Sequence, residues 1–156
     1  MKRDHYVNGH KFDLGWVGQI EQVNNGLVEY LIDNNVIPVI SCIGTDKEGN
    51  LYNINGDNFA SSIASSLKVD EFVLLTDVDG LMYDHKDPST LIRNIDVNEL
   101  TYLLKDGTIS GGMIPKIESC IQTIKEGVKQ VRIINGMKPE LIKDMNQNNI
   151  GTVIKE

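Results

Sequence analysis

The stretch that precedes an apolar helical pattern places two amides and a carboxylate close together. Asn53, Asn55 and Asp57 occupy every second position, so they would point to one side of an extended segment. They would form a cluster of amide and carboxylate groups at the start of a helix. A structural interpretation stays open: a turn followed by Asp57 as a helix N-cap, worth about 1 kcal/mol. Two amides are, however, more than one cap needs.

A second candidate is the polar run that follows the apolar segment Phe72–Leu75. If that segment is a buried strand, Thr76, Asp77 and Asp79 lie at its carboxyl end, where open parallel sheets bind ligands. The alternatives are a plain polar turn and the Asp-x-Asp motif of haloacid-dehalogenase phosphatases. Leu81 occupies a position where that motif expects Thr or Val, and no acidic pair follows a later strand. An EF-hand is excluded, because no Glu lies at the required spacing.

A third candidate opens the longest helical pattern, which begins near Met113. Ser110 is a plausible cap, and Gly111 and Gly112 would let the backbone approach an anion at the helix start. Lys116, in the first turns, could reach the same anion. A lone cation there is slightly unfavourable with the helix dipole, which favours a functional lysine over a merely solvated one. The Walker A spacing is absent.

The elements that would position these segments alternate between strands and helices. Asn8-Gly9 predicts a hairpin, because a type I′ turn needs residues that tolerate positive φ. Strands are predicted at 16–23, 36–40, 72–75, 131–134 and 152–154, and helices at 25–34, 59–67, 98–105, 113–128 and 139–147. This order predicts a single α/β domain over residues 1–156, with an open, mainly parallel sheet and helices on both faces.

Composition restricts the function classes. The chain has 156 residues, 40% of them hydrophobic, and a formal net charge of −7, which disfavours general binding to nucleic acid. No apolar run is long enough to span a membrane, and no secretory signal is expected. Cys42 and Cys120 stand among apolar residues, so we expect buried, reduced thiols and a cytoplasmic location. His5, His10 and His85 are expected at the surface without a catalytic role.

The ordered series of segments resembles acetylglutamate kinases, of the amino acid kinase family. The resemblance covers about residues 13–154 and depends on the pieces Gly15–Gly18, Ile37–Ile40, Tyr52–Asp57, Leu74–Gly80, Ile109–Lys116 and Gly151-Thr152. It implies the family's three-layer αβα fold and ATP-dependent phosphorylation of the side-chain carboxylate of N-acetyl-L-glutamate, a step of arginine biosynthesis. Carbamate and aspartate kinases are the alternatives within the family, and the pattern of residues 53–57 with 110–113 argues against both.

Residue roles follow from the resemblance, position by position. Lys116 matches the lysine that neutralises the transferring phosphoryl group, and Asp57 the acidic residue that orients the catalytic lysines. Asn53 matches the asparagine that binds the amino-acid substrate, with Asn55 beside it. The positions that match the nucleotide-binding segments are Thr76, Asp77, Val78, Asp79, Gly80, Leu81, Met82, Thr108, Ile109, Ser110, Gly111 and Gly112. ATP is expected with Mg²⁺, which phosphates and water would hold rather than dedicated protein ligands.

The resemblance also implies a missing part. Family members begin with a strand, a lysine and a glycine-rich loop that binds phosphates, and none of these has a counterpart here. The chain is therefore expected to correspond to the carboxyl-terminal, nucleotide-binding portion of such an enzyme. We expect it to form a homo-oligomer or to pair with a missing amino-terminal half. The alternative is a non-catalytic nucleotide-binding or regulatory module.

Overall fold

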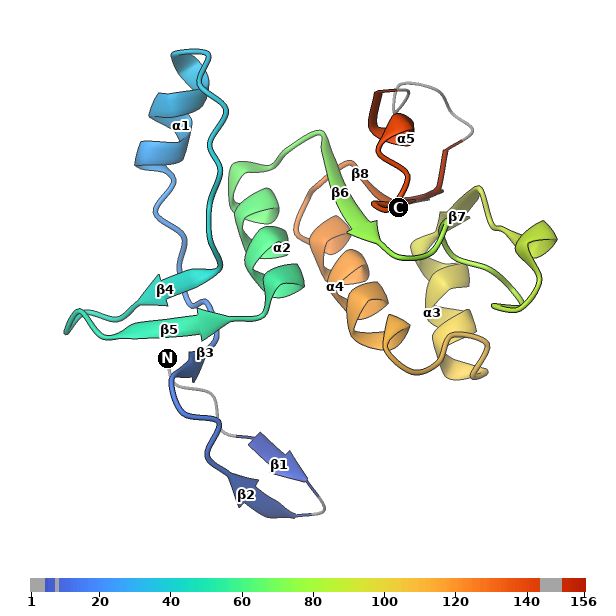
Figure 1. Cartoon of the computed structure of the whole chain (residues 1–156), viewed down its shortest axis with the longest axis horizontal. Coiled ribbons are helices and arrows are strands. Elements are labelled where there is room, and N and C mark those ends of the chain that lie inside the picture. The colour runs from blue at the N-terminus through green and yellow to red at the C-terminus, as the bar shows by residue number, and fades with distance from the viewer. Residues whose placement is uncertain (1–4, 8, 144–149) are drawn as a thin grey trace. The chain divides into compact units, whose positions relative to one another are not determined.

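The computed structural model describes residues 5–7, 9–143 and 150–156. The chain divides into two compact units, residues 1–67 (unit 1) and 68–156 (unit 2), and each is described by itself. Both contain strands and helices, with parallel and antiparallel strand pairs in their sheets (Figure 1). The α/β fold class predicted from the sequence is therefore confirmed.

Unit 1 contains two small sheets and two helices. Its strands are β1 (His5–Val7), β2 (His10–Phe12), β3 (Val17–Gly18), β4 (Ile43–Thr45) and β5 (Leu51–Ile54), and its helices are α1 (Gly26–Asp33) and α2 (Gly56–Leu67). β1 and β2 form the predicted antiparallel hairpin, and Gly9 in its turn has a φ of +78°. β5 lies between β3, with which it is parallel, and β4, with which it is antiparallel.

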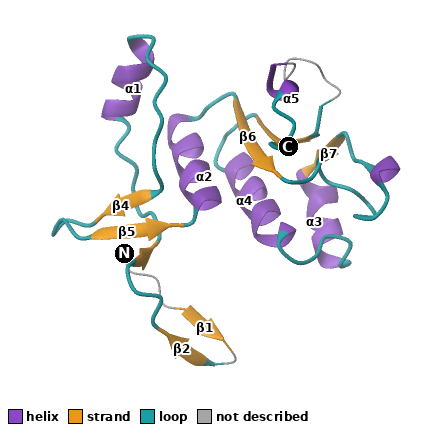
Figure 2. Cartoon of the chain, in the orientation of Figure 1, coloured by secondary structure: helices purple, strands orange, loops and turns teal. Residues whose placement is uncertain are grey.

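One predicted strand is wrong. Residues 36–40 form no strand; they belong to the loop that joins α1 to β4 (Figure 2). The apolar run is instead exposed, with Ile37 at 88% and Val39 at 97% of full accessibility. A continuous apolar run forms a strand only where a neighbouring strand pairs with its backbone N–H and C=O groups. In the described part of unit 1, no strand pairs with residues 36–40. The strand predicted at 16–23 is confirmed only over Val17–Gly18.

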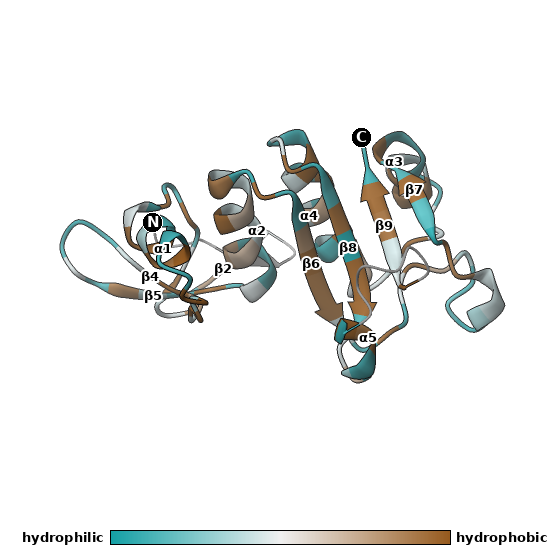
Figure 3. Ribbon diagram, turned by 90° about the horizontal axis from the view of Figure 1, so that it is seen from above, coloured by the Kyte–Doolittle hydropathy of each residue, from teal (hydrophilic) through white to brown (hydrophobic). Residues whose placement is uncertain are grey.

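Unit 2 holds a four-stranded sheet in the order β6-β8-β9-β7. Its strands are β6 (Glu71–Thr76), β7 (Asn94–Asp96), β8 (Gln130–Asn135) and β9 (Thr152–Lys155). β6 is parallel to β8, and β7 to β9, whereas β8 and β9 are antiparallel. The two pairs therefore point in opposite directions (Figure 3). β7 and the one-turn 3₁₀ helix η1 (Pro88–Thr90) had no signal in the sequence pattern.

The helices of unit 2 are α3 (Val97–Lys105), α4 (Met113–Lys125) and α5 (Glu140–Lys143). α3 and α4 pack against each other and against β7 and β8 respectively. The core consists of fully buried side chains from these elements, among them Leu100, Ile117, Ile133, Ile134 and Ile154. The predicted helix at 139–147 is confirmed for Glu140–Lys143, and residues 144–147 lie outside the described part of the chain.

Two local features explain why unit 2 folds as it does. Arg132 is almost fully buried, and its charge is compensated by Glu71, 2.7 Å from Nε, and by the carbonyl of Ile150. Asp96 caps α3 by accepting hydrogen bonds from the backbone amides of Asn98 and Glu99. Arg132 lies within β8 and Asp96 is the last residue of β7, so these contacts restrain both strands against the segments beside them.

Candidate active site

The carboxyl ends of β6 and β8 form the edge of the unit 2 sheet that carries most of the predicted residues. Because the two strands are parallel and paired from Glu71–Gln130 to Thr76–Asn135, the loops that follow them emerge side by side. α4 precedes β8 by a short turn, so its amino terminus lies at this same edge. The edge therefore gathers residues 76–82, the approach to α4 at 108–112, and Lys116.

The loop of residues 77–82, here the β6 loop, is fixed by residues distant in sequence. The amide of Gly136 donates to the carbonyl of Thr76 at 2.7 Å. The hydroxyl of Thr152, fully buried, accepts from the amide of Leu81 at 2.8 Å and donates to the carbonyl of Ile92 at 2.6 Å. Gly80 has a φ of +147°, and a Cβ there would lie 2.6 Å from the Thr152 hydroxyl, so only glycine fits.

Asp79 is the most strongly anchored carboxylate of the β6 loop. Its Oδ1 accepts from Nδ2 of Asn135 at 2.8 Å and from Nζ of Lys138 at 2.6 Å. These hydrogen bonds, that of Lys138 foremost, lower the pKa of Asp79. Asn135 also accepts from the amide of Met137, which orders the start of the turn. Asn135 and Lys138 were not predicted as site residues, because nothing in the sequence connects them with a loop more than fifty residues earlier.

The predicted nucleotide residues divide by accessibility. Leu81 and Ile109 have buried side chains, and the amide of Ile109 donates to the carbonyl of Leu103, so their side chains belong to the core. Asp77, Ser110, Gly111 and Gly112 are exposed, and Thr76, Val78, Asp79, Met82 and Thr108 are half-buried. The hydroxyl of Thr76 lies 3.1 Å from Oδ1 of Asp77. A ligand at this edge would thus meet carboxylates and loop backbone.

The start of α4 differs from the sequence prediction. Gly112, not Ser110, occupies the N-cap position, and it supplies no side-chain cap. Ser110 and Gly111 instead accept, through their carbonyls, from the amides of Met113 and Ile114. The reason is local: residues 110–113 form a tight turn that continues directly into the helix. Lys116 is half-buried one turn further on.

The remaining predicted residues lie in unit 1, at the junction of β5 and α2. Asn53 is exposed within β5 and pairs with Val17 and Ile43 of the neighbouring strands. Oδ1 of Asn55 accepts from the amide of Asn58 at 3.1 Å, which makes Asn55 the helix cap. The capping role considered for Asp57 is therefore wrong: Asp57 lies one residue inside α2, in its first turn. A carboxylate there is favourable with the helix dipole.

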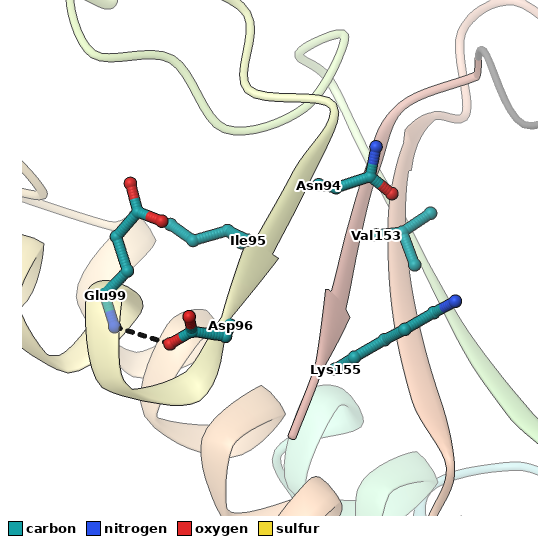
Figure 4. A pocket seen from close by; sticks show the side chains of 6 residues that line it. All are labelled: Asn94, Ile95, Asp96, Glu99, Val153 and Lys155. Carbon is teal, nitrogen blue, oxygen red and sulfur yellow. Dashed lines mark hydrogen bonds between the residues drawn. The ribbon is translucent and has the colours of Figure 1, made fainter.

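A further hollow of about 280 Å³ lies elsewhere on unit 2. Asn94, Ile95, Asp96, Glu99, Val153 and Lys155 line it (Figure 4). These residues belong to β7, β9 and the start of α3. The strands β7 and β9 run in the direction opposite to that of β8. The hollow therefore lies near the opposite edge of the sheet from the β6 loop. Of its two carboxylates, Asp96 caps α3 and Glu99 accepts a hydrogen bond from the hydroxyl of Tyr83.

Some classes of site are not found in the described part of the chain. No three His, Cys, Asp or Glu side chains come together there as metal ligands. The described helices include none that is both long and apolar enough to cross a membrane. Cys120 is buried as expected, but Cys42 is only half-buried, because it lies between the exposed residues Ser41 and Ile43 just before β4. His10 and His85 are exposed, as expected.

Similarity to known proteins identifies the family of the chain. Residues 3–135 match the amino acid kinase family. The acetylglutamate kinase of Methanosphaera stadtmanae is 46% identical over 92% of this chain and 49% of its own length, and that of Methanocaldococcus jannaschii is 47% identical over 91% and 48%. A carbamate kinase from Giardia lamblia bound to AMP-PNP superposes with a TM-score of 0.67 at 27% identity, covering 88% of this chain and 50% of its own. The chain thus spans about half the length of these relatives.

Proposed function

This chain belongs to the amino acid kinase family, and from that premise we propose that it is the nucleotide-binding portion of an acetylglutamate kinase. The reaction is ATP-dependent phosphorylation of the side-chain carboxylate of N-acetyl-L-glutamate, in cytoplasmic arginine biosynthesis. The observation that carries the proposal is the identity of 46–47% to acetylglutamate kinases over more than 90% of this chain. The Giardia carbamate kinase, whose structure is bound to the ATP analogue AMP-PNP, has a related fold and supports nucleotide binding by this chain.

Phosphoryl transfer to a carboxylate requires the residue types found here, which are lysine, asparagine and aspartate. Phosphoryl transfer relies on positioning and on neutralisation of the charge on the transferred group, not on a covalent nucleophile. In the proposal the β6 loop and residues 108–112 receive the nucleotide, and Lys116 neutralises the transferring phosphoryl group. Asn53 and Asn55 bind the amino-acid substrate, and Asp57 orients the lysines. A carboxylate acceptor is already nucleophilic, so a general base is not required.

Mg²⁺ enters the proposal with ATP. Magnesium in kinases is usually bound through substrate phosphates, water and one or two carboxylates. The described residues assemble no protein-made metal cage, and Asp77 is the exposed carboxylate at the sheet edge that could face the ion. The ion would then neutralise phosphate charge while the protein orients the nucleotide.

We propose that this chain associates with another polypeptide. β6 lies at the edge of the unit 2 sheet, with Leu75 52% exposed, and residues 36–40 of unit 1 present an exposed apolar run. Edge strands and apolar patches of this kind favour association. We expect the partner to be either the other half of the enzyme or a second copy of this chain.

A coupled assay for ADP release tests the function. The chain alone should bind Mg·ATP weakly, with no turnover of acetylglutamate. Addition of the part of the Methanosphaera enzyme that this chain does not match should restore turnover with acetylglutamate and not with carbamate or aspartate. Turnover of carbamate alone would move the chain to another branch of the family. The second candidate function is a non-catalytic nucleotide-binding module, and the half-length match to the relatives favours it. Nucleotide binding without turnover in any of these combinations would support that candidate.

A further inference from the structure

Two ion pairs of the same composition connect the β6 and β8 segments, one at each end of these strands. Lys129 and Asp70 pair just before the strands begin, and Lys138 and Asp79 pair just after they end. Only the second pair lies at the edge that carries the predicted nucleotide residues. The first is the more exposed, with side chains 76% and 84% accessible against 45% and 35% for Lys138 and Asp79.

The second pair belongs to a larger cluster, which we call the strand-end cluster: Asp79, Asn135 and Lys138. Both donors converge on one oxygen, Oδ1 of Asp79, at 2.8 and 2.6 Å. Asn135 is 7% exposed and forms the last residue of β8, so one of the two donors is rigidly placed. Asp79 in turn lies in the middle of the β6 loop, next to Gly80, whose backbone fits tightly against Thr152.

We propose that Lys138 is a positioning residue for the nucleotide: through Asp79 it holds the β6 loop in the conformation that receives ATP. The inference rests on the function proposed above. Half-exposed ion pairs contribute little to global stability. The main effect of the Lys138–Asp79 pair is therefore to restrain the conformation of the β6 loop. A loop that is ordered before binding loses less conformational entropy when the ligand arrives. Lys138 therefore sets the affinity for ATP while leaving the rate of phosphoryl transfer to other residues.

The test compares Lys138→Met with Lys129→Met, which removes the matched pair at the other end of the same strands. Titration calorimetry with Mg·ATP on the full chain should show affinity lowered about fivefold in Lys138→Met, as loss of preorganisation predicts. Lys129→Met should bind like wild type, and both melting temperatures should stay close to that of wild type. Lys138→Arg keeps a charged donor and should recover most of the affinity.

A second readout is independent of nucleotide. Amide hydrogen exchange of residues 77–82 without ATP should become faster in Lys138→Met and remain unchanged in Lys129→Met. In the reconstituted enzyme, Lys138→Met should raise KM for ATP and leave kcat within about twofold, as loss of ground-state binding does.

The outcomes separate the two proposals. If the wild-type chain binds no Mg·ATP, the proposed function fails, and the inference fails with it. If wild type binds ATP and Lys138→Met binds equally well with unchanged exchange, only the inference is overturned. Equal weakening by Lys138→Met and Lys129→Met would also overturn it, because the effect would then be general destabilisation of the β6–β8 pair. Tighter binding in Asp79→Asn would overturn it too, because Asp79 would then act by repelling phosphate.

Discussion

Units 1 and 2 contain similar proportions of apolar sequence but use it differently. Among the described residues, the buried apolar side chains lie in unit 2 except for Ile54 and Ala64, whereas most of the exposed large apolar ones lie in unit 1. Unit 1 depends more on hydrogen bonds, many of them local: Asp46 accepts from Asn50, Tyr52 and the amide of Glu48 at the β4–β5 turn. A packed core makes a unit self-sufficient, and local polar bonds do not. The core of unit 2 therefore specifies its own fold, whereas unit 1 depends on further contacts.

Separate expression of the two units is the strongest test of this difference. Residues 68–156 should unfold in one cooperative thermal transition, because their core is continuous around the sheet. Residues 1–67 should show no such transition, because their apolar surface is too little buried to offset chain entropy. Circular dichroism melting and the dispersion of amide NMR signals measure both. A sharp transition in the isolated 1–67 segment would contradict the comparison.

Lys116→Ala tests whether unit 2 carries the chemistry. In the reconstituted enzyme the change should lower kcat by about 10²–10³, as removal of a preorganised charge typically does. Lys125→Ala, at the other end of the same helix, is the control and should keep activity. Steady-state rates and melting temperatures of the variants distinguish a catalytic role of Lys116 from a structural one. Retained activity with a loss of several degrees in melting temperature would assign Lys116 a structural role.

Core truncation compares the two units residue by residue. Leu100→Ala, at a fully buried position of unit 2, should lower the free energy of unfolding by about 2–5 kcal/mol. Leu27→Ala, at a position of unit 1 that is 68% exposed, should change it by less than about 0.5 kcal/mol. Urea denaturation of the full chain gives both values. A large effect at Leu27 would show that α1 is covered in solution.

Asp57→Asn asks whether unit 1 contributes to catalysis. Asn55, not Asp57, caps α2, so the fold should change little. If Asp57 orients lysines by its charge, turnover in the reconstituted enzyme should fall by about 10–100-fold, the loss found when the residues that orient metal ligands are replaced. The same assay on Asn58→Asp, which adds a carboxylate one position later, is the control and should not mimic the loss. Unchanged turnover in Asp57→Asn would confine unit 1 to substrate binding.

The smallest expected effect concerns pH. The side-chain hydrogen bond from Asn50, with those from Tyr52 and two backbone amides, lowers the pKa of Asp46 to about 2. The native state therefore favours the carboxylate, and its stabilisation is complete above the unfolded value of 3.8 and declines as the pH falls towards 2. NMR titration of the carboxyl carbon should show this midpoint, and Asn50→Ala should raise it. A midpoint near 3.8 in wild type would mean that the β4–β5 turn is not formed in solution.

Much of the local structure was predictable from the sequence. Helical spacing of apolar residues located α1 to α4 to within a few residues, and the Asn8-Gly9 signal located the first hairpin. The order of short motifs indicated the amino acid kinase family before any fold was known, because such motifs depend on neighbouring residues only. The residues assigned to the site from that resemblance remain predictions, and the β6 loop follows β6 at the end of the sheet where β8 also ends.

Tertiary structure decided what depends on distant partners. The sequence determined that residues 36–40 are apolar, but whether they form a strand depends on a neighbour for their backbone hydrogen bonds. Asp79 was visible as a carboxylate in a loop, whereas its restraint by Asn135 and Lys138 exists only because β6 and β8 pair in parallel, in register to their last residues. Periodicity and capping are local properties of the chain, while strand pairing joins residues that the sequence keeps far apart, and that pairing alone fixed the edge at which we place the nucleotide.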